Sequence, residues 1–328
     1  MKQEAFEKLH SSTWDRFETW VRALSGDRSV KLDWETQRLV GREFPGMYRQ
    51  ICHHLAISRS RRYSIGLQQR LNQLALDGHQ HLYRSRTPLH LALARFVVFD
   101  FPATVRRFRG FVLASAMLFS VPALAIAIAM QFHPELVFSL LDPSDVSQIE
   151  QMYDPSNSVL GRERQSDTDI LMFGYYIYNN ISIGFQTFAG GLLFGLGSVF
   201  YLLHNGLLFG AIATHLTTIG FTSTFWTFVA AHSAFELTAI VIFGGVGLML
   251  GYGAIAPGRK TRWGAIRDRA ISGMPLVYGA SLMLVAAAFL EAFWSSTTWP
   301  PDYAKYAVGA TLWVLLALYF SLAGRNES

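Results

Sequence analysis

One stretch of this sequence constrains the fold more than any other: the 87 residues from Ile170 to Ala256 contain a single formally charged side chain, Glu236. Soluble domains carry roughly 25% charged residues, so a stretch of this length and composition cannot form a water-facing surface. A helix of about 20 apolar residues spans the hydrocarbon core of a bilayer. The stretch therefore predicts several membrane-spanning helices and excludes a soluble enzyme.

The charges outside this stretch are segregated by segment. Residues 1–109 have a net charge of +9, residues 132–169 of −6 and residues 257–270 of +4. Because Lys and Arg are enriched in short cytoplasmic segments of membrane proteins, we expect a cytoplasmic N-terminal part, an acidic outer loop at 132–169 and a basic inner loop at 257–270. An odd number of crossings must then separate the two loops.

Six crossings in total satisfy both the lengths and the charges. The middle three are divided only by weak breaks, at residues 204–206 and 220–223, and the segment 206–221 is short enough for a re-entrant or broken helix. The proline-rich acidic loop is expected to have little regular structure. The expected crossings are residues 111–130, 181–203, 206–221, 225–251, 272–293 and 305–323.

The predicted fold class is therefore all-α. Residues 106–328 are expected to form a polytopic membrane helix bundle of about six crossings, and residues 1–105 a cytoplasmic helical domain in front of it. An even number of crossings places the N- and C-termini both in the cytoplasm.

The N-terminal domain shows helical periodicity. Trp14, Phe17, Val21 and Leu24 recur at spacings of three and four, which places them on one helical face. Pro45 and Gly46 are expected to end a second helix before another begins at Met47, and a further helix is expected at about 65–84. No nucleic-acid-binding motif occurs, and a basic domain beside anionic lipid needs no nucleic-acid partner, so the expected partner is the lipid bilayer.

Glycines recur at four-residue spacing inside the apolar segments, which is typical of helices that pack closely in membranes. Flexible or broken helices that line a substrate path are the alternative interpretation. The sequence shows more of these glycine faces than we can assign to packing within one chain. We therefore also expect homo-oligomerisation. The expected packing glycines are Gly191, Gly195, Gly206, Gly210, Gly247 and Gly251.

Polar residues within the membrane segments are costly to insert and often functional. Glu236 lies near the middle of its crossing, and His232 precedes it by four residues, so the two share a helical face. Glu291 in the fifth crossing and Asn179-Asn180 at the outer mouth of the second are expected in the same outer half of the membrane, whereas Asn205 is expected at an inner end.

Three interpretations of this polar cluster stay open: a buried group that fixes helix register, a proton or ion pathway, and a metal site. His232 and Glu236 alone are a weak metal signature because no HExxH pattern and no clear third ligand accompany them; His215 is one candidate for that ligand. No nucleophile elbow and no phosphate-binding loop occur. We therefore expect no catalytic residues, no metal and no cofactor.

Several of these motifs, in this order and spacing, resemble the stage II sporulation protein M family of bacterial integral membrane proteins. Ser233 stands where members of that family usually have glycine, and the segments Met47-Tyr48-Arg49 and Leu71-Asn72 resemble the cytoplasmic part of its longer members. The motifs are Asn179-Asn180, Phe188 with Gly191 and Gly195, Asn205-Gly206 with Gly210, residues 232–237 and residues 287–293.

The resemblance implies a multi-helix protein of the bacterial inner (cytoplasmic) membrane. In spore formers the family takes part in an envelope complex with peptidoglycan-degrading partners. Two functions follow as hypotheses. The first is a non-enzymatic scaffold or component of a cell-envelope complex with envelope protein partners. The alternative is a transporter or channel for a proton, ion or small solute that uses His232, Glu236 and Glu291.

Overall fold

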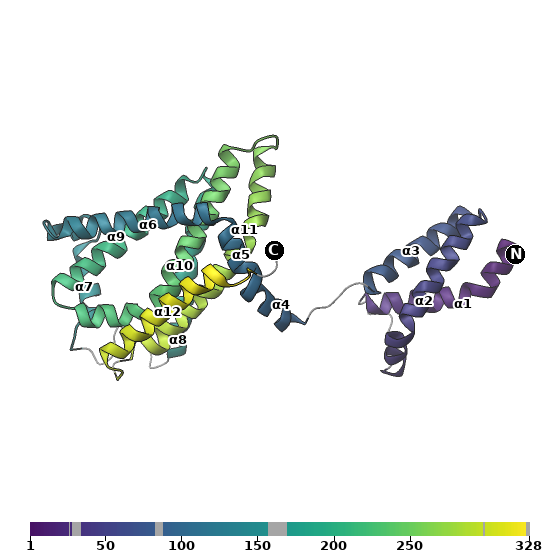
Figure 1. Ribbon diagram of the computed structural model, residues 1–328, viewed down its shortest axis with the longest axis horizontal. Coiled ribbons are helices and arrows are strands. Elements are labelled where there is room, and N and C mark those ends of the chain that lie inside the picture. Colours follow the sequence, from purple (N-terminus) through teal and green to yellow (C-terminus); the bar gives the residue numbers. More distant parts are fainter. Residues whose placement is uncertain (26, 28–33, 83–87, 157–168, 298, 326–328) are drawn as a thin grey trace. The chain divides into compact units, whose positions relative to one another are not determined.

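The computed structural model of the chain describes residues 1–25, 27, 34–82, 88–156, 169–297 and 299–325 (Figure 1). The chain divides into two compact units, Met1–Leu89 and His90–Ser328, and each has a hydrophobic core of its own. The boundary therefore falls earlier than the expected residue 105. The reason is that Phe101 is buried in the core of the second unit.

The first unit consists of three helices whose apolar faces meet in one core. Trp14, Phe17 and Val21 are buried there, as their spacing predicts, whereas Leu24 is 40% exposed. The helices are α1 (Gln3–Leu24), α2 (Trp34–Ser60) and α3 (Ile65–Leu82).

Helix α2 runs without a break through Pro45 and Gly46, so the predicted end of a helix at this point is wrong. A proline inside a helix removes one backbone hydrogen bond. Phe44 and Met47 on either side are both buried in the core of the first unit, and this continuous apolar face holds the two halves together. The helix expected at 65–84 is α3, and residues 83 and 84 lie outside the described residues.

The second unit is a bundle of long helices joined by short π-helical (η1, η4) and 3₁₀ (η2, η3) turns. In chain order its elements are α4 (Leu89–Arg95), η1 (Phe96–Asp100), α5 (Phe101–Arg107), α6 (Arg109–Met130), η2 (Pro134–Ser139), α7 (Pro143–Tyr153), α8 (Asp169–Ala189), η3 (Gly190–Leu192), α9 (Leu196–Thr218), α10 (Thr222–Ile255), α11 (Arg262–Leu290), η4 (Glu291–Ser295) and α12 (Asp302–Leu322).

Helix α10 is the centre of this bundle, because α6, α8, α9, α11 and α12 all pack against it. Helices α6 and α9 run side by side along one part of the bundle (Figure 1). Within the described residues, five helices are long and apolar enough to cross a membrane: α6, α9, α10, α11 continued by η4, and α12. The fold is therefore a helical membrane bundle, and four expected crossings coincide with α6, α10, α11–η4 and α12.

The expected crossings 181–203 and 206–221 are wrong in their bounds. Helix α8 ends at Ala189, the chain turns through residues 190–195, and α9 then continues through residues 204–206 to Thr218. Phe194 and Gly195 have φ angles of 55° and 83°, a left-handed conformation that stops a helix. Residues 206–221 are therefore the second half of α9 and its exit turn, not a short re-entrant segment.

Helix α8 is not among the five candidate spans, because Asn179, Asn180 and three tyrosines lower its hydropathy. It nevertheless runs along the bundle, antiparallel to α11. Near its start the Phe173 ring lies 5.8 Å from that of Phe293, and near its end Gly184 faces Phe243 and Leu284. It is thus a sixth element that connects the two ends of the bundle.

The two ends of the bundle differ in charge. We call the end that contains η2, α7, the α9–α10 turn and the start of α12 the acidic end. There Glu150 of α7 lies 2.7 Å from His215, and the Thr224 hydroxyl donates to the Tyr153 carbonyl at 2.6 Å. We call the end that contains η3 and the α10–α11 turn the basic end, where the Arg262 guanidinium lies 5.9 Å from the Phe194 ring.

The basic loop expected at 257–270 is shorter in the structure, because α11 already begins at Arg262. The Thr261 side chain caps this helix by accepting a hydrogen bond from the Gly264 N–H at 3.1 Å. Arg269 lies over the Tyr252 ring at 5.3 Å. The α10–α11 pair therefore continues as helix through most of the basic residues.

The acidic loop expected at 132–169 has more regular structure than predicted, since η2 and α7 lie within it. Pro143 occupies the first turn of α7, where a proline fits a helix well. Val137 and Val146 are buried against Met130 and Ala211 of the bundle, so apolar contacts hold the segment in place. Residues 157–168 lie outside the described part of the chain.

The six expected packing glycines all lie where another element comes close. A Cβ added at Gly206 would overlap the Phe119 carbonyl of α6, and one at Gly247 would overlap the Ser198 hydroxyl of α9. Gly191 lies in the 3₁₀ turn η3 and Gly195 directly before α9, and they face Gly247 and Gly251 of α10. These contacts are all within one chain.

The first unit should lose stability in acid because of His54. Burial, with His10 and His53 nearby, lowers the pKa of His54 to about 4, whereas an unfolded histidine has a pKa of about 6.5. Between these values the unfolded chain binds more protons, so stability falls as the pH falls from about 6.5 to about 4, by up to about 3 kcal/mol. Urea unfolding of residues 1–89 at a series of pH values measures this loss.

The His54→Gln variant is the comparison, because glutamine retains an acceptor for the Trp14 indole N–H, which lies 3.0 Å from His54 Nδ1. Its stability should vary less with pH than that of the wild type over the same interval. An equal pH dependence in the two proteins would contradict the assignment to His54.

The Gly247→Ala variant should destabilise the bundle by about 1–3 kcal/mol, the usual range for overpacking a filled interior. The new methyl group would displace the Ser198 hydroxyl, which donates to the Thr187 carbonyl at 2.6 Å. Gly174→Ala is the matched control, since no atom lies within 4 Å of a Cβ added there. Thermal unfolding in detergent should separate the two variants, and equal unfolding temperatures would contradict the prediction.

Candidate functional site

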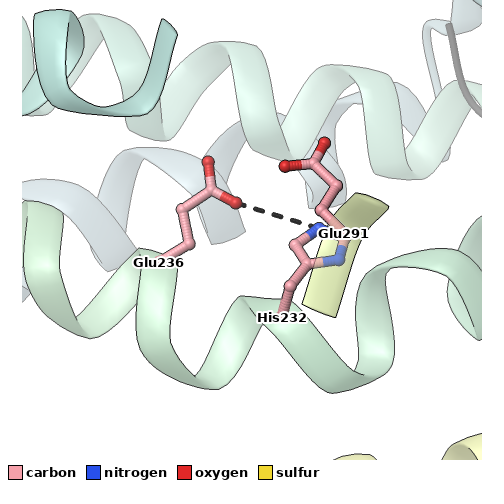
Figure 2. A group of neighbouring side chains, drawn as sticks. All are labelled: His232, Glu236 and Glu291. Atoms are coloured by element: carbon pink, nitrogen blue, oxygen red, sulfur yellow. Dashed lines mark ion pairs between the residues drawn. The ribbon is translucent and has the colours of Figure 1, made fainter. Parts of the chain in front are cut away.

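Three ionisable side chains meet in the half of the bundle nearer the acidic end. His232 and Glu236 come from α10, and Glu291 is the first residue of η4. Figure 2 shows the two carboxylates and the imidazole turned toward a common space. One donor atom from each of the three residues lies within 4.8 Å of the other two.

The helical spacing of α10 sets the first part of this geometry. Residues four apart lie one above the other on a helix, and His232 Nε2 accordingly lies 3.8 Å from Glu236 Oε2. The Phe228 ring meets the imidazole edge-on, with ring centroids 5.2 Å apart. The His232 side chain is 6% exposed and that of Glu236 20%, so the pair is largely enclosed by protein.

The π-helical turn η4 sets the second part. It begins at Glu291 and ends at Ser295, and these two residues, four apart, both lie on the side that faces α10. The Ser295 hydroxyl is 3.0 Å from His232 Nδ1. This hydrogen bond orients the ring and leaves Nε2 directed toward the carboxylates.

The electrostatics of the cluster require a positive counterpart. Two ionised carboxylates about 4 Å apart repel by about 4 kcal/mol even at an effective dielectric constant of 20. Such a pair is stable when it shares a proton or when a cation lies between its members. The arrangement can therefore hold a proton or a metal cation, or fix the register of α10 against η4.

Lys305 of α12 is a functional candidate that the sequence reasoning missed. Its side chain is buried, and its ammonium group donates to the carbonyl of Ser295 at 3.0 Å and to that of Thr297. Ser295 thus contacts His232 with its hydroxyl and Lys305 with its carbonyl. The sequence could have indicated this residue, since a lysine within an apolar helix is unusual. It was missed because it lies at the edge of the expected crossing.

Asn179 and Asn180 lie in the middle of α8, not at its mouth. The Asn179 amide donates to the Asn180 side chain at 3.1 Å, and Asn180 is buried. On the same face, Tyr176 packs with Ala288 and Ala292 one turn earlier. This register places Asn180 on the side of α8 that faces α11 and η4, but the structure describes no hydrogen bond from it to the three clustered residues.

Asn205 and His215 lie apart from the cluster. Asn205 is near the middle of α9 instead of at an inner end, and its amide donates to the Tyr201 carbonyl of the same helix at 2.7 Å. His215, the third metal ligand that the sequence suggested, pairs with Glu150 at the acidic end. Glu291 takes the third place beside His232 and Glu236.

Two family models match parts of the chain. Residues 4–84 match a domain of unknown function (DUF8413), which lies within the first unit. No curated protein and no solved structure matches the chain. Residues 108–296, from α6 through η4, match the family described as stage II sporulation protein M. This match covers more than half of the chain and includes the whole polar cluster, so the protein belongs to the stage II sporulation protein M family.

Proposed function

We propose that this protein is a non-enzymatic scaffold of the bacterial inner membrane, a component of a cell-envelope complex that binds envelope proteins. The observation that carries the proposal is the folded segment at the acidic end. Helix α7 is held to the bundle by the Glu150–His215 pair and by the hydrogen bond from Thr224 to Tyr153. A surface fixed in this way, with Phe138 of η2 54% exposed beside it, suits a docking site for a partner.

The proposed orientation places the acidic end outside and both termini in the cytoplasm. It is supported by the distribution of basic residues. Arg106 at the basic end donates to the Phe320 carbonyl near the end of α12, and Arg262 and Arg269 lie at the same end of the bundle. The first unit would then present a basic helical surface to cytoplasmic partners or anionic lipid.

Homo-oligomerisation remains part of this proposal, but the packing glycines no longer argue for it. All six face backbone or side chains of the same chain. A second copy would need another surface.

The polar cluster favours a second candidate function, transport of a proton or cation. Glu236, His232 and Glu291 lie together inside a membrane bundle, and ionisable residues in that setting often mark an ion path. The scaffold is the preferred function, because the cluster is tied into the packing of α10, η4 and α12 through Ser295 and Lys305.

A photoreactive phenylalanine analogue placed at Phe138 should form a covalent adduct with an envelope protein in the native membrane. The reason is that a scaffold uses its exposed, ordered surface for binding. The same analogue at Leu124 of α6, which is 63% exposed in a membrane-spanning helix, should form no protein adduct. Absence of any adduct from Phe138 would count against a scaffold that docks partners at the acidic end.

Purified full-length protein in liposomes should conduct neither protons nor cations above the background of empty vesicles when a gradient is imposed. Glu236→Gln should give the same result as the wild type. The transport candidate predicts instead a flux that Glu236→Gln abolishes and Glu150→Gln preserves, since Glu150 pairs with a histidine outside the cluster.

A further inference from the structure

We propose that His232, Glu236 and Glu291 bind a divalent transition-metal ion of the Zn²⁺ class, which joins α10 to η4. The site does not depend on the scaffold function, because it rests on the arrangement of three side chains and their neighbours. The sequence offered only His215 as a third ligand for His232 and Glu236, and His215 pairs with Glu150 instead. The structure brings Glu291 to them from a different helix.

The distances suit coordination. Zn²⁺ lies about 2.0–2.2 Å from imidazole nitrogen and carboxylate oxygen, so two of its ligand atoms are about 3–4 Å apart. His232 Nε2 and Glu236 Oε2 are 3.8 Å apart, and the donor set including Glu291 lies within 4.8 Å. Glutamate side chains have three rotatable bonds, so a small rotation brings the third carboxylate to bonding distance.

The surroundings of the histidine also suit a metal ligand. An imidazole that binds a metal through one nitrogen almost always has a hydrogen-bond partner on the other. Ser295 is that partner, 3.0 Å from Nδ1. It holds the ring so that Nε2 faces the carboxylates (Figure 2).

The charges are balanced by a dication. Two carboxylates with a neutral imidazole carry −2, which a divalent ion neutralises inside a bundle where an unbalanced charge is costly. The nearby ammonium group of Lys305 is directed at the carbonyls of Ser295 and Thr297. It therefore stabilises the end of η4.

The ligand set favours transition metals over Mg²⁺ and Ca²⁺. An imidazole ligand suits Zn²⁺, Fe²⁺ or Ni²⁺, whereas Mg²⁺ and Ca²⁺ prefer oxygen donors alone. Three protein ligands leave at least one position for water. The ion would connect residues 55 positions apart in the chain, from Glu236 to Glu291.

The test uses full-length protein, purified through a tag without histidine, stripped with a chelator and then titrated with Zn²⁺. Wild-type protein should retain one more ion per chain than the Glu236→Gln/Glu291→Gln double variant, and each single variant should bind that ion roughly 100-fold more weakly or worse. Glu150→Gln is the matched control, since it removes a carboxylate from a histidine pair outside the site. It should bind as the wild type does.

Two further measurements do not depend on the folding of the glutamine variants. Co²⁺ added to stripped wild-type protein should give the visible absorption of histidine and carboxylate coordination, and excess Zn²⁺ but not Mg²⁺ should remove it. Ser295→Ala should weaken Zn²⁺ binding by about 10–100-fold, as expected for loss of an orienting hydrogen bond. Zn²⁺ should also raise the unfolding temperature of the wild type.

The proposal is overturned if wild-type protein binds no more Zn²⁺ than the double variant, or if Co²⁺ shows only the spectrum of the hydrated ion. Either result would leave a proton shared between the carboxylates as the positive counterpart in the cluster.

Discussion

Close backbone contact along α10 is the constraint on which the whole bundle depends. Lipid chains are as apolar as leucine, so helices in a bilayer associate through tight packing and hydrogen bonds instead of the hydrophobic effect. Gly247 and Gly251 let the α8–α9 turn reach the backbone of α10. The space freed by Gly247 also admits the Ser198 hydroxyl, which donates to the Thr187 carbonyl at 2.6 Å. One helix can therefore contact five others, and its register is fixed along the bundle.

That fixed register is what gives the polar cluster its geometry. His232 and Glu236 lie together because of helix spacing alone, but Glu291 meets them only because α10 and α11 pack in one alignment. The same alignment directs Ser295 to the imidazole. The cluster is thus a product of the packing, and removing either glutamate charge changes the site without removing the contacts that build it.

Sequence reasoning predicted the elements that depend on composition and missed those that depend on backbone geometry. Long apolar runs were enough to predict α6, α10, α11 and α12, and periodicity was enough for the core of the first unit. The α8–α9 turn was placed wrongly because it contains no charged residue. What ends the helix there is the left-handed backbone at Phe194 and Gly195, which composition does not reveal. Asn205 caused the opposite error, because a helix end was predicted where the helix continues. Its side chain bonds to the backbone of its own helix and does not break it. In the site, the pair at i and i+4 was predictable, whereas the contact between His232 and Ser295 depends on how η4 packs against α10.

Polar side chains join the helices at two levels, inside the bundle at the cluster and at the acidic end. His232 of α10 contacts Ser295 of η4, and the Ser295 carbonyl accepts from Lys305 of α12. At the acidic end the Ser223 hydroxyl donates to the Asp302 carboxylate, which joins the first turns of α10 and α12, and Thr224 holds α7 by the Tyr153 carbonyl. Buried polar contacts are best attested as devices that specify one arrangement of helices. Helices α10 and α12, which contact the cluster, therefore also hold the surface that is proposed to bind partners. The polar residues that a transporter would use for transfer would instead give a scaffold a defined docking surface.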